Sequence, residues 1–294
     1  MRVLVTGWFS LEGGGATAGD VMARDVACAW LAERGIAYDV AQERALGPGV
    51  DWFRVAPQRY THVLFICGPV GADAGLAEML ERFAGCRRIA LNVSVVGEPA
   101  RRPFDVLIER DGRGGGRPDL ALAAPLGRAP VVARVEIPGR QPEYADAAPD
   151  VAHAAFDRLL AGREAAVVTV DTRLDPALPG RRSAAEVEAL FGVADVVLTT
   201  RLHGIVLALR QGRPALAIDV VPGGAKVLAQ ARALDWPAAV AVDAVDDAEL
   251  ERHLDWCLGD EARELAGSTA ERLAGDIGAL RTELERALGS SRYG

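Results

Sequence analysis

The chain has 294 residues, half of them hydrophobic and a quarter charged, with a formal net charge of −8. This length and apolar content can bury a sizeable core and allow two domains of ordinary size. The acidic balance disfavours a nucleic-acid surface, because phosphate backbones bind to basic faces. No apolar run approaches the ~20 residues of a membrane span, and the start MRVLVTGWF lacks a signal peptide's cleavage region. We therefore expect a cytoplasmic globular protein without a transmembrane segment.

In the first part of the chain, apolar strand patterns alternate with helical patterns. The expected strands are residues 2–9, 37–41, 62–67, 88–95 and 105–109, and the expected helices are residues 20–34 and 74–84. Such alternation predicts a parallel sheet covered on both faces. The Pro/Gly-rich passage APLGRAP then interrupts the pattern, so we place a domain boundary at residue 128.

The alternation resumes in the second part of the chain. The expected strands are residues 131–137, 165–171, 195–199, 214–219 and 238–242, and the expected helices are residues 150–161, 184–191, 202–211, 224–234, 247–258 and 261–288. The fold class predicted is thus α/β, with two doubly wound Rossmann-like domains, 1–128 and 129–294, facing a cleft. The last helix has an amphipathic period and is expected to pack on the domain, which leaves open a homodimer contact.

The stretch LTTRLHGIV places two costly polar side chains, Arg201 and His203, between a buried strand and a buried helix. In open parallel sheets, ligands bind at the carboxyl ends of strands, where helix N-termini offer free N–H groups. Thr199 and Thr200 could cap the helix, and Gly204 could let a ligand approach the backbone. In the alternative interpretation, Arg201 pairs with a carboxylate and His203 is a packing residue.

The longer pattern VADVVLTTRLHGIVLALRQGRPALAID, followed by GGAKVLAQARALDWP, resembles the polysaccharide pyruvyltransferase family. The family's signature is a strand, R-L-H-G, a helix, a G-x-P turn into the next strand and a lysine that opens the next helix. Residues 201–204, residues 212–214 and Lys226 match these features. Lys226 is also the single lysine among 33 basic residues.

The N-terminal part resembles the family through shorter patterns. Gly19 and Asp20, which enter a helix, resemble the family's asparagine-x-glycine-aspartate start, with Thr17 in place of the asparagine. The pair Arg110 and Asp111 after a strand, and later Asp119, resemble further family positions. ICGPVG stands where the family has a glycine triplet.

The resemblance implies a two-domain fold of the GT-B type and a transferase that moves pyruvyl from phosphoenolpyruvate to hydroxyls of a sugar or a sugar-containing acceptor. Such enzymes usually make a cyclic ketal and release phosphate, which suggests a role in exopolysaccharide or cell-wall glycan biosynthesis. The second domain would bind the donor, and the first domain the acceptor. We expect no cofactor and no metal, since phosphoenolpyruvate is a co-substrate and no metal-ligand cluster stands out. A peripheral membrane contact is left open.

The residue types fit the chemistry that this resemblance implies. Arginine can hold a carboxylate or phosphate with two parallel bonds, so Arg201 is the main donor-binding candidate, with Lys226 and Arg173 as further cations. Histidine titrates near neutral pH, so His203 is the candidate acid or phosphate-side partner. Asp20 could be the base for the acceptor hydroxyl, or merely an N-cap. The predicted substrate-binding set also includes Gly19, Thr200, Leu202 and Gly204. We expect Asp20 and His203 on opposite walls of the cleft.

Other interpretations remain. Gly13-x-Gly15-x-x-Ala18 formally matches a dinucleotide fingerprint, with Asp39 near the position of a ribose-binding acid, but Ser10 to Glu12 separate the strand from the glycines. A loop on the acceptor side and a plain surface loop are the alternatives. For the whole chain, the alternatives are a GT-B glycosyltransferase with a nucleotide-sugar donor and a catalytically silent binding homologue.

Overall fold

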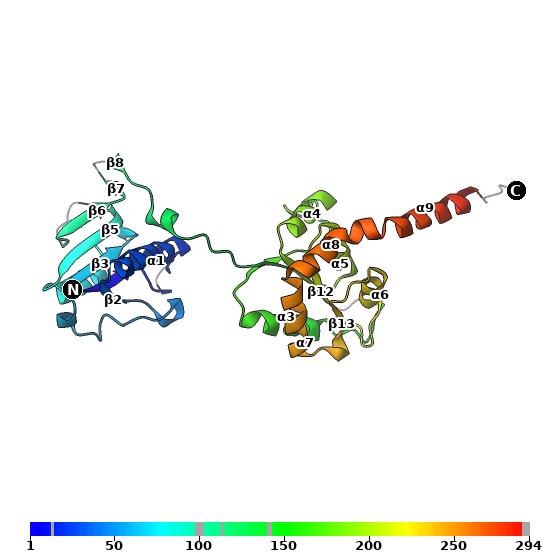
Figure 1. Cartoon of the computed structure of the whole chain (residues 1–294), viewed down its shortest axis with the longest axis horizontal. Coiled ribbons are helices and arrows are strands. Elements are labelled where there is room, and N and C mark those ends of the chain that lie inside the picture. The colour runs from blue at the N-terminus through cyan, green and yellow to red at the C-terminus, as the bar shows by residue number, and fades with distance from the viewer. Residues whose placement is uncertain (13–14, 98–102, 113–114, 140–142, 290–294) are drawn as a thin grey trace. The chain divides into compact units, whose positions relative to one another are not determined.

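The computed structural model describes residues 1–12, 15–97, 103–112, 115–139 and 143–289. The chain divides into two compact units, Met1–Gly127 and Arg128–Gly294, each with its own parallel sheet (Figure 1). Among the helices of the described residues, none is both long and apolar enough to cross a bilayer.

The first unit (unit 1, Met1–Gly127) is a parallel sheet with one helix against each face. Its strands are β1 (Arg2–Gly7), β2 (Ala37–Val40), β3 (His62–Ile66), β4 (Pro69–Val70), β5 (Arg87–Val95) and β6 (Val106–Glu109), and its helices are α1 (Ala18–Glu33) and α2 (Ala74–Arg82). The strand order is β2-β1-β3-β5, and β4 and β6 both pair with β5. A short antiparallel pair, β7 (Asp111–Gly112) and β8 (Gly115–Gly116), follows β6.

Alternation along the strands of unit 1 sends side chains to two cores, one on each face. Val3 and Val5 of β1 pack in the cluster that includes Ala23 and Val26 of α1, whereas Leu4 packs on the opposite side. That opposite cluster also contains Leu76, Met79, Leu80 and Phe83, from α2 and its end. Figure 1 shows α1 lying across the sheet.

The second unit (unit 2, Arg128–Gly294) repeats this plan with more helices. Its strands are β9 (Val131–Val135), β10 (Ala166–Thr169), β11 (Val196–Thr199), β12 (Ala215–Asp219) and β13 (Ala239–Ala241). Its helices are α3 (Pro149–Ala161), α4 (Ala184–Gly192), α5 (Leu202–Arg210), α6 (Lys226–Ala233), α7 (Asp247–Cys257), α8 (Asp260–Arg272) and α9 (Ala274–Gly289). The strand order is β10-β9-β11-β12-β13, with all pairs parallel.

Both units have the same doubly wound order, in which the second strand lies outside the first and the third strand lies on the other side. The direction of winding therefore reverses between the first and third strands. In unit 1 this switch point lies between β1 and β3, and in unit 2 it lies between β9 and β11. The carboxyl ends of these strand pairs are the places where such sheets bind ligands.

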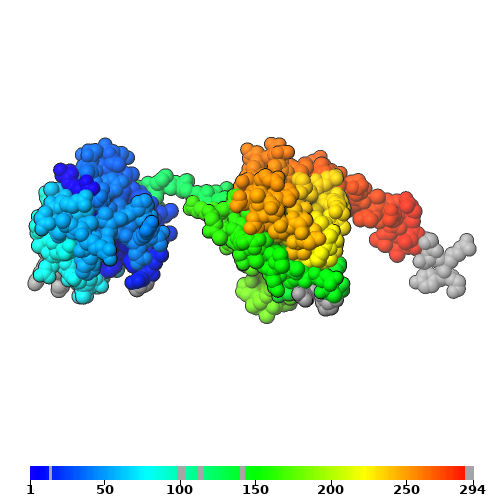
Figure 2. Space-filling view, turned by 90° about the horizontal axis from the view of Figure 1, so that it is seen from below, coloured from blue at the N-terminus to red at the C-terminus, as the bar shows by residue number. Residues whose placement is uncertain are grey.

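The sequence-based prediction of two doubly wound α/β units is confirmed, but the C-terminal helix differs from the prediction. The expected helix over residues 261–288 is two helices, α8 and α9, separated at Leu273. Ala262 and Ala266 of α8 are buried in the core, whereas Ile277, Leu280 and Leu284 of α9 are exposed. Figure 2 shows α9 in red after the orange α8. The amphipathic period therefore predicted packing correctly for α8 only.

Candidate functional site

Arg201 lies at the switch point of unit 2 and joins its strands. It follows β11, and its Nε donates to the backbone oxygen of Glu136, which follows β9, at 2.9 Å. Its Nη1 donates to Thr172 Oγ1 at 3.4 Å, and its Nη2 lies 3.4 Å from Asp171 Oδ1, both just beyond β10. Because only 14% of the Arg201 side chain is exposed, these contacts fix the guanidinium at the edge of the sheet.

Three arginines share the carboxylate of Asp171. Arg173 donates to it through its backbone N–H and its guanidinium, with Nη2 to Oδ2 at 2.8 Å. Arg181 Nη1 donates to the same oxygen at 2.8 Å, and Arg201 completes the set. Arg181 also pairs with Asp175 at 3.6 Å, so two carboxylates face three guanidinium groups, and the remaining positive charge is suited to an anionic ligand. We call Asp171, Arg173, Arg181 and Arg201 the Asp171 cluster.

The charges of the Asp171 cluster act strongly on one another. Hydrogen bonding from Arg173, supported by the positive charge of Arg201, lowers the pKa of Asp171 to about 2. Burial lowers the pKa of Arg201, as does the charge of Arg173, while Asp171 acts in the opposite direction. Asp171 is therefore ionised at neutral pH, and an anion that draws the arginines away must compete with it.

His203 lies in the first turn of α5. It is the second residue of the helix and is exposed, and its imidazole has no hydrogen bond or ion pair within the part of the chain that the structure describes. The alternative interpretation is therefore confirmed for Arg201, which pairs with the carboxylate of Asp171, but not for His203, which is not a buried packing residue. No side chain caps α5, so its first N–H groups point to the same edge as the imidazole.

Thr199, Thr200 and Gly204 have roles other than those expected. Thr199 Oγ1 accepts from the N–H of Arg201 and donates to Val135 O, so it joins strands instead of capping the helix. Thr200 Oγ1 accepts from the N–H of Ile137 at 2.9 Å and is itself buried. A Cβ on Gly204 would lie 1.9 Å from Thr199 Oγ1, so the absent side chain makes room for Thr199 and not for a ligand.

Lys226 opens α6, in a loop held by a buried carboxylate. Asp219, at the end of β12, is 1% exposed and accepts four backbone N–H groups, from Val221, Ala225, Val227 and Leu228. The N-terminus of α6 is thus already occupied by Asp219. The Nζ of Lys226 lies 5.3 Å from the centre of the Tyr144 ring, and the residue is exposed. Asp219 therefore fixes the loop between β12 and α6, and with it the position of Lys226.

In unit 1, Asp20 and Gly19 lie in the first turn of α1. The N-cap is Thr17, whose Oγ1 accepts from the N–H of Asp20, while Asp20 Oδ2 accepts from the N–H and hydroxyl of Thr17 at 2.9 and 2.7 Å. Asp20 is therefore the third helical residue of a capping box, and not an N-cap. Asp39 pairs with Arg2 at 2.7 Å and accepts from Tyr60, so it supports the fold. Gly13 lies outside the described residues.

Arg110, Asp111 and Asp119 form a polar network beyond the central strands of unit 1. Arg110 pairs with Asp119 and donates through Nη2 to Ser94 Oγ, which in turn contacts Asp111 at 2.7 Å. The side chain of Asn92 holds the residues on either side of Asp119, because it donates to Pro118 O and accepts from the N–H of Leu120. The three residues that resembled family positions thus lie at the carboxyl edge of the unit 1 sheet.

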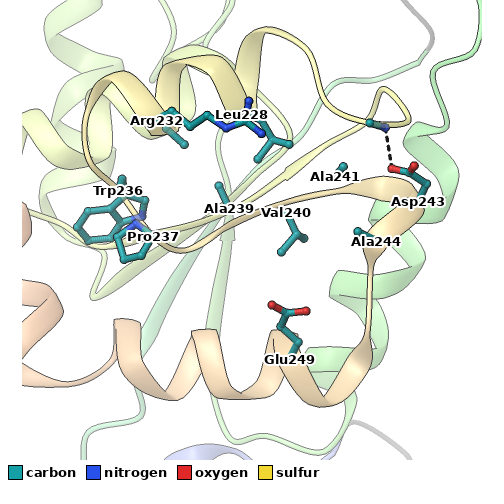
Figure 3. Close-up of a pocket in the computed structure, with 12 residues that line it drawn as sticks. Leu228, Arg232, Trp236, Pro237, Ala239, Val240, Ala241, Asp243, Ala244 and Glu249 are labelled. Carbon is teal, nitrogen blue, oxygen red and sulfur yellow. Dashed lines mark hydrogen bonds between the residues drawn. The ribbon is translucent and has the colours of Figure 1, made fainter.

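A groove of about 570 Å³ lies beside β13, the outer strand of unit 2 (Figure 3). Arg232 and Leu228 of α6 lie on one side, and Glu249 of α7 points toward the strand from the other. None of the residues predicted from the sequence to bind substrate lines this groove. Within the described residues, no group of three His, Cys, Asp or Glu side chains could hold a metal ion.

Residues 119–220 match the family model of polysaccharide pyruvyl transferases. The resemblance found in the sequence is confirmed over this range. Of the predicted site residues, the polysaccharide pyruvyl transferase match includes Arg173, Thr200, Arg201, Leu202, His203 and Gly204. Gly19, Asp20 and Lys226 lie outside it.

Solved structures also resemble the chain at low identity. The glycotransferase of kitacinnamycin is 14% identical, with 97% of this chain and 98% of that chain covered and a TM-score of 0.36. HepE of Anabaena, in complex with UDP and glucose, is 13% identical, with 99% and 100% covered and a TM-score of 0.36. An α,α-trehalose-phosphate synthase from Burkholderia vietnamiensis is 13% identical, with 80% and 67% covered and a TM-score of 0.38. No curated protein sequence matches the chain.

The residue that sequence reasoning missed is Asp171, which holds the arginines together. Besides Arg173, which the sequence predicts, the same segment contributes Arg181, whose side chain is 24% exposed and bonded to Asp171. The available signal was the position of Asp171, a carboxylate directly after a strand of a parallel sheet, where ligand-binding groups gather.

Proposed function

We propose that the chain is a transferase that moves a pyruvyl group from phosphoenolpyruvate to hydroxyls of a sugar-containing acceptor. The observation behind this proposal is that the unit 2 switch point has both the Asp171 cluster, which includes Arg201, and an exposed His203. The family match over residues 119–220 supports it, because these residues lie within the matched range.

Phosphoenolpyruvate carries a carboxylate and a phosphate on three carbons, so its site needs several fixed cations. Arg201 is fixed by Glu136, Thr172 and Asp171 before any ligand binds, which lowers the ordering cost of binding. Arg173 has 61% of its side chain exposed and can turn from Asp171 toward an anion. The uncapped start of α5 adds N–H donors and the positive end of the helix dipole. We assign the donor to this edge.

The transfer proceeds in two steps, and protons move in both. In the first step, an acceptor oxygen bonds to C2 of phosphoenolpyruvate, its hydroxyl proton goes to a base, and the C3 methylene gains a proton to become methyl. In the second step, the bond between C2 and the phosphate oxygen breaks, and a second hydroxyl bonds to C2 with loss of its proton, giving a cyclic ketal and phosphate. We assign His203 to protonation of C3 or of the departing phosphate, because its ring is exposed and unpartnered within the described residues.

We keep Asp20 as the proposed base for the acceptor hydroxyl. Both hydrogen bonds that it accepts from Thr17 use Oδ2, which leaves Oδ1 for a substrate proton. Arg173 and Lys226 are proposed as donor-binding cations, and the first turns of α1 and α5, with Gly19 and Leu202, as backbone contacts.

Calorimetric titration and phosphate release test this function together. Phosphoenolpyruvate should bind and raise the melting temperature, whereas UDP-glucose should do neither. Incubation with phosphoenolpyruvate and a lipid-linked or polymeric glycan acceptor should release phosphate and add a pyruvyl ketal, detectable by mass. Stabilisation by UDP-glucose, with phosphoenolpyruvate silent, would favour the nucleotide-sugar glycosyltransferase and remove this proposal.

A further inference from the structure

Gly7 ends β1 at the switch point of unit 1, and Trp8 and Phe9 follow it. Phe9 is buried in the core on the α1 side, whereas Trp8 packs partly against the opposite core. A Cβ on Gly7 would lie 2.7 Å from both Ile66 O and the Phe9 ring. The glycine is therefore needed for the chain to leave the strand with Phe9 turned inward, and this turn brings the indole of Trp8 to the sheet edge.

The indole of Trp8 is fixed by β3, the other strand of the switch point, and by the chain that leads from β3 into β4. Its Nε1 donates to Pro69 O at 3.1 Å, and it meets the Phe65 ring edge to face, with 5.8 Å between ring centres. Gly68 has a φ of 68°, and a Cβ there would lie 2.2 Å from Trp8 Cδ1. Gly68 therefore packs directly against the indole, and any side chain at residue 68 would displace it. Together with the hydrogen bond to Pro69, this contact holds the ring in place before a ligand binds. The Trp8 side chain is partly buried, so part of it remains accessible to a ligand.

A polar network is bonded to the residue that packs against this ring. The N–H of Ser94 donates to Gly68 O at 3.2 Å, and Ser94 Oγ donates to Asp111 at 2.7 Å. Arg110 donates to the same Ser94 Oγ and pairs with Asp119. Because two carboxylates face one guanidinium, the network is net negative and suits the hydroxyls of a neutral polyol better than a phosphate.

We propose that Trp8 is the stacking platform for an uncharged pyranose ring of the acceptor. The apolar C–H face of the ring would lie on the indole, and its hydroxyls would donate to the neighbouring carboxylates. This inference rests on the proposed function for the identity of the ligand as an acceptor, but the ring-binding property can be measured without any transfer reaction.

The test is saturation-transfer NMR with the full chain and the methyl glycosides of glucose, galactose, mannose and N-acetylglucosamine. The wild type should transfer saturation to ring C–H protons of at least one glycoside. Trp8→Leu keeps an apolar side chain without an aromatic face and should raise the dissociation constant about fivefold, whereas Trp8→Phe should raise it by less. Trp30→Ala is the matched control, since Trp30 is 46% exposed on α1, and it should leave binding unchanged.

The inference would be overturned by the absence of transfer to any glycoside, by an equal loss in Trp30→Ala, or by binding that Trp8→Leu leaves intact. Binding of UDP that depends on Trp8 would likewise contradict a neutral ring as ligand. Thermal-shift titration with phosphoenolpyruvate on the same variants separates this inference from the proposed function: donor stabilisation should be equal in wild type and Trp8→Leu. Glycoside binding through Trp8 without any response to phosphoenolpyruvate would support Trp8 as a sugar-binding residue and contradict the proposed pyruvyl transfer.

Discussion

The two switch points have the same strand order but present different chemistry. In unit 2 the residues beyond β9, β10 and β11 bring together Arg201, Arg173 and Arg181 around one carboxylate. In unit 1 the residues beyond β1 and β3 bring Trp8 against Gly68, which accepts from Ser94, and Ser94 in turn donates to Asp111. One edge is cationic and uses guanidinium groups, and the other is aromatic and acidic.

This contrast separates what the fold determines from what the residues determine. A doubly wound sheet fixes the location of a binding edge, whatever ligand it takes. The ligand class depends on the few side chains that follow the central strands. Under the proposed function, the unit 2 edge would bind the anionic donor and the unit 1 edge the neutral acceptor.

Removing the proton-transfer group from the cationic edge should have the largest effect. His203→Asn keeps polarity and rough size but cannot transfer a proton at neutral pH, so turnover should fall by about 10²–10⁴-fold. Phosphoenolpyruvate should still bind, because the arginines remain, and the melting temperature should hardly change, because His203 is exposed. Steady-state kinetics and calorimetry measure both quantities. Near wild-type turnover in a folded variant would remove His203 from the mechanism.

The buried cap of α6 should matter mainly for stability. Asp219→Asn replaces one of two acceptor oxygens with an amide that faces backbone N–H groups, so the free energy of unfolding should fall by about 2–3 kcal/mol. Urea unfolding measures it. Asp246→Asn is the matched control, because Asp246 is an N-cap that accepts from Glu249 and asparagine caps equally well. Equal losses in the two variants would show that burial at Asp219 has no special importance.

Changing the shape of the central cation should weaken donor binding. Arg201→Lys keeps the charge but loses the planar fork and its bonds to Glu136 and Thr172. The Michaelis constant for phosphoenolpyruvate should rise about tenfold, with turnover changed less than threefold. Kinetics at varied phosphoenolpyruvate, with the melting temperature checked, separates binding from folding. A fall in turnover alone would contradict a binding role.

Asp171 should give the smallest effect, and one that depends on pH. The pKa of Asp171 is lowered on folding from its ordinary value of 3.8 to about 2, so its stabilisation is complete above pH 4 and is lost as the pH falls toward 2. With solvent screening, Asp171→Asn should reduce the free energy of unfolding by about 1–2 kcal/mol at pH 6, and this difference should shrink toward pH 2. Urea unfolding across this range checks it, with Asp260→Asn as an exposed control. A difference that persists at pH 2 would assign the effect to packing.

The parts of the molecule that the sequence predicted are those determined locally. Strands such as β11 can be recognised from the sequence because Val196, Val197 and Leu198 form a short apolar run before Thr199. Arg201 and His203 were found because they share one short motif. Asp171 was missed because its partnership with Arg201 spans 30 residues and exists only after β9, β10 and β11 pair. Trp8 was missed for the same reason, since Gly68 reaches it across the sheet. The break at Leu273 lies two residues before Gly275, a helix-end signal that the amphipathic period alone did not show.

Hydrogen exchange with and without phosphoenolpyruvate tests the central contrast between the two edges most directly. Saturating phosphoenolpyruvate should slow exchange in peptides that cover residues 171–182 and 199–206, where the Asp171 cluster and the start of α5 lie. Peptides over residues 7–12 and 66–71 should exchange at the same rate with and without the donor. Protection confined to these unit 1 peptides, or the absence of protection at residues 199–206, would contradict the assignment of the anionic donor to unit 2.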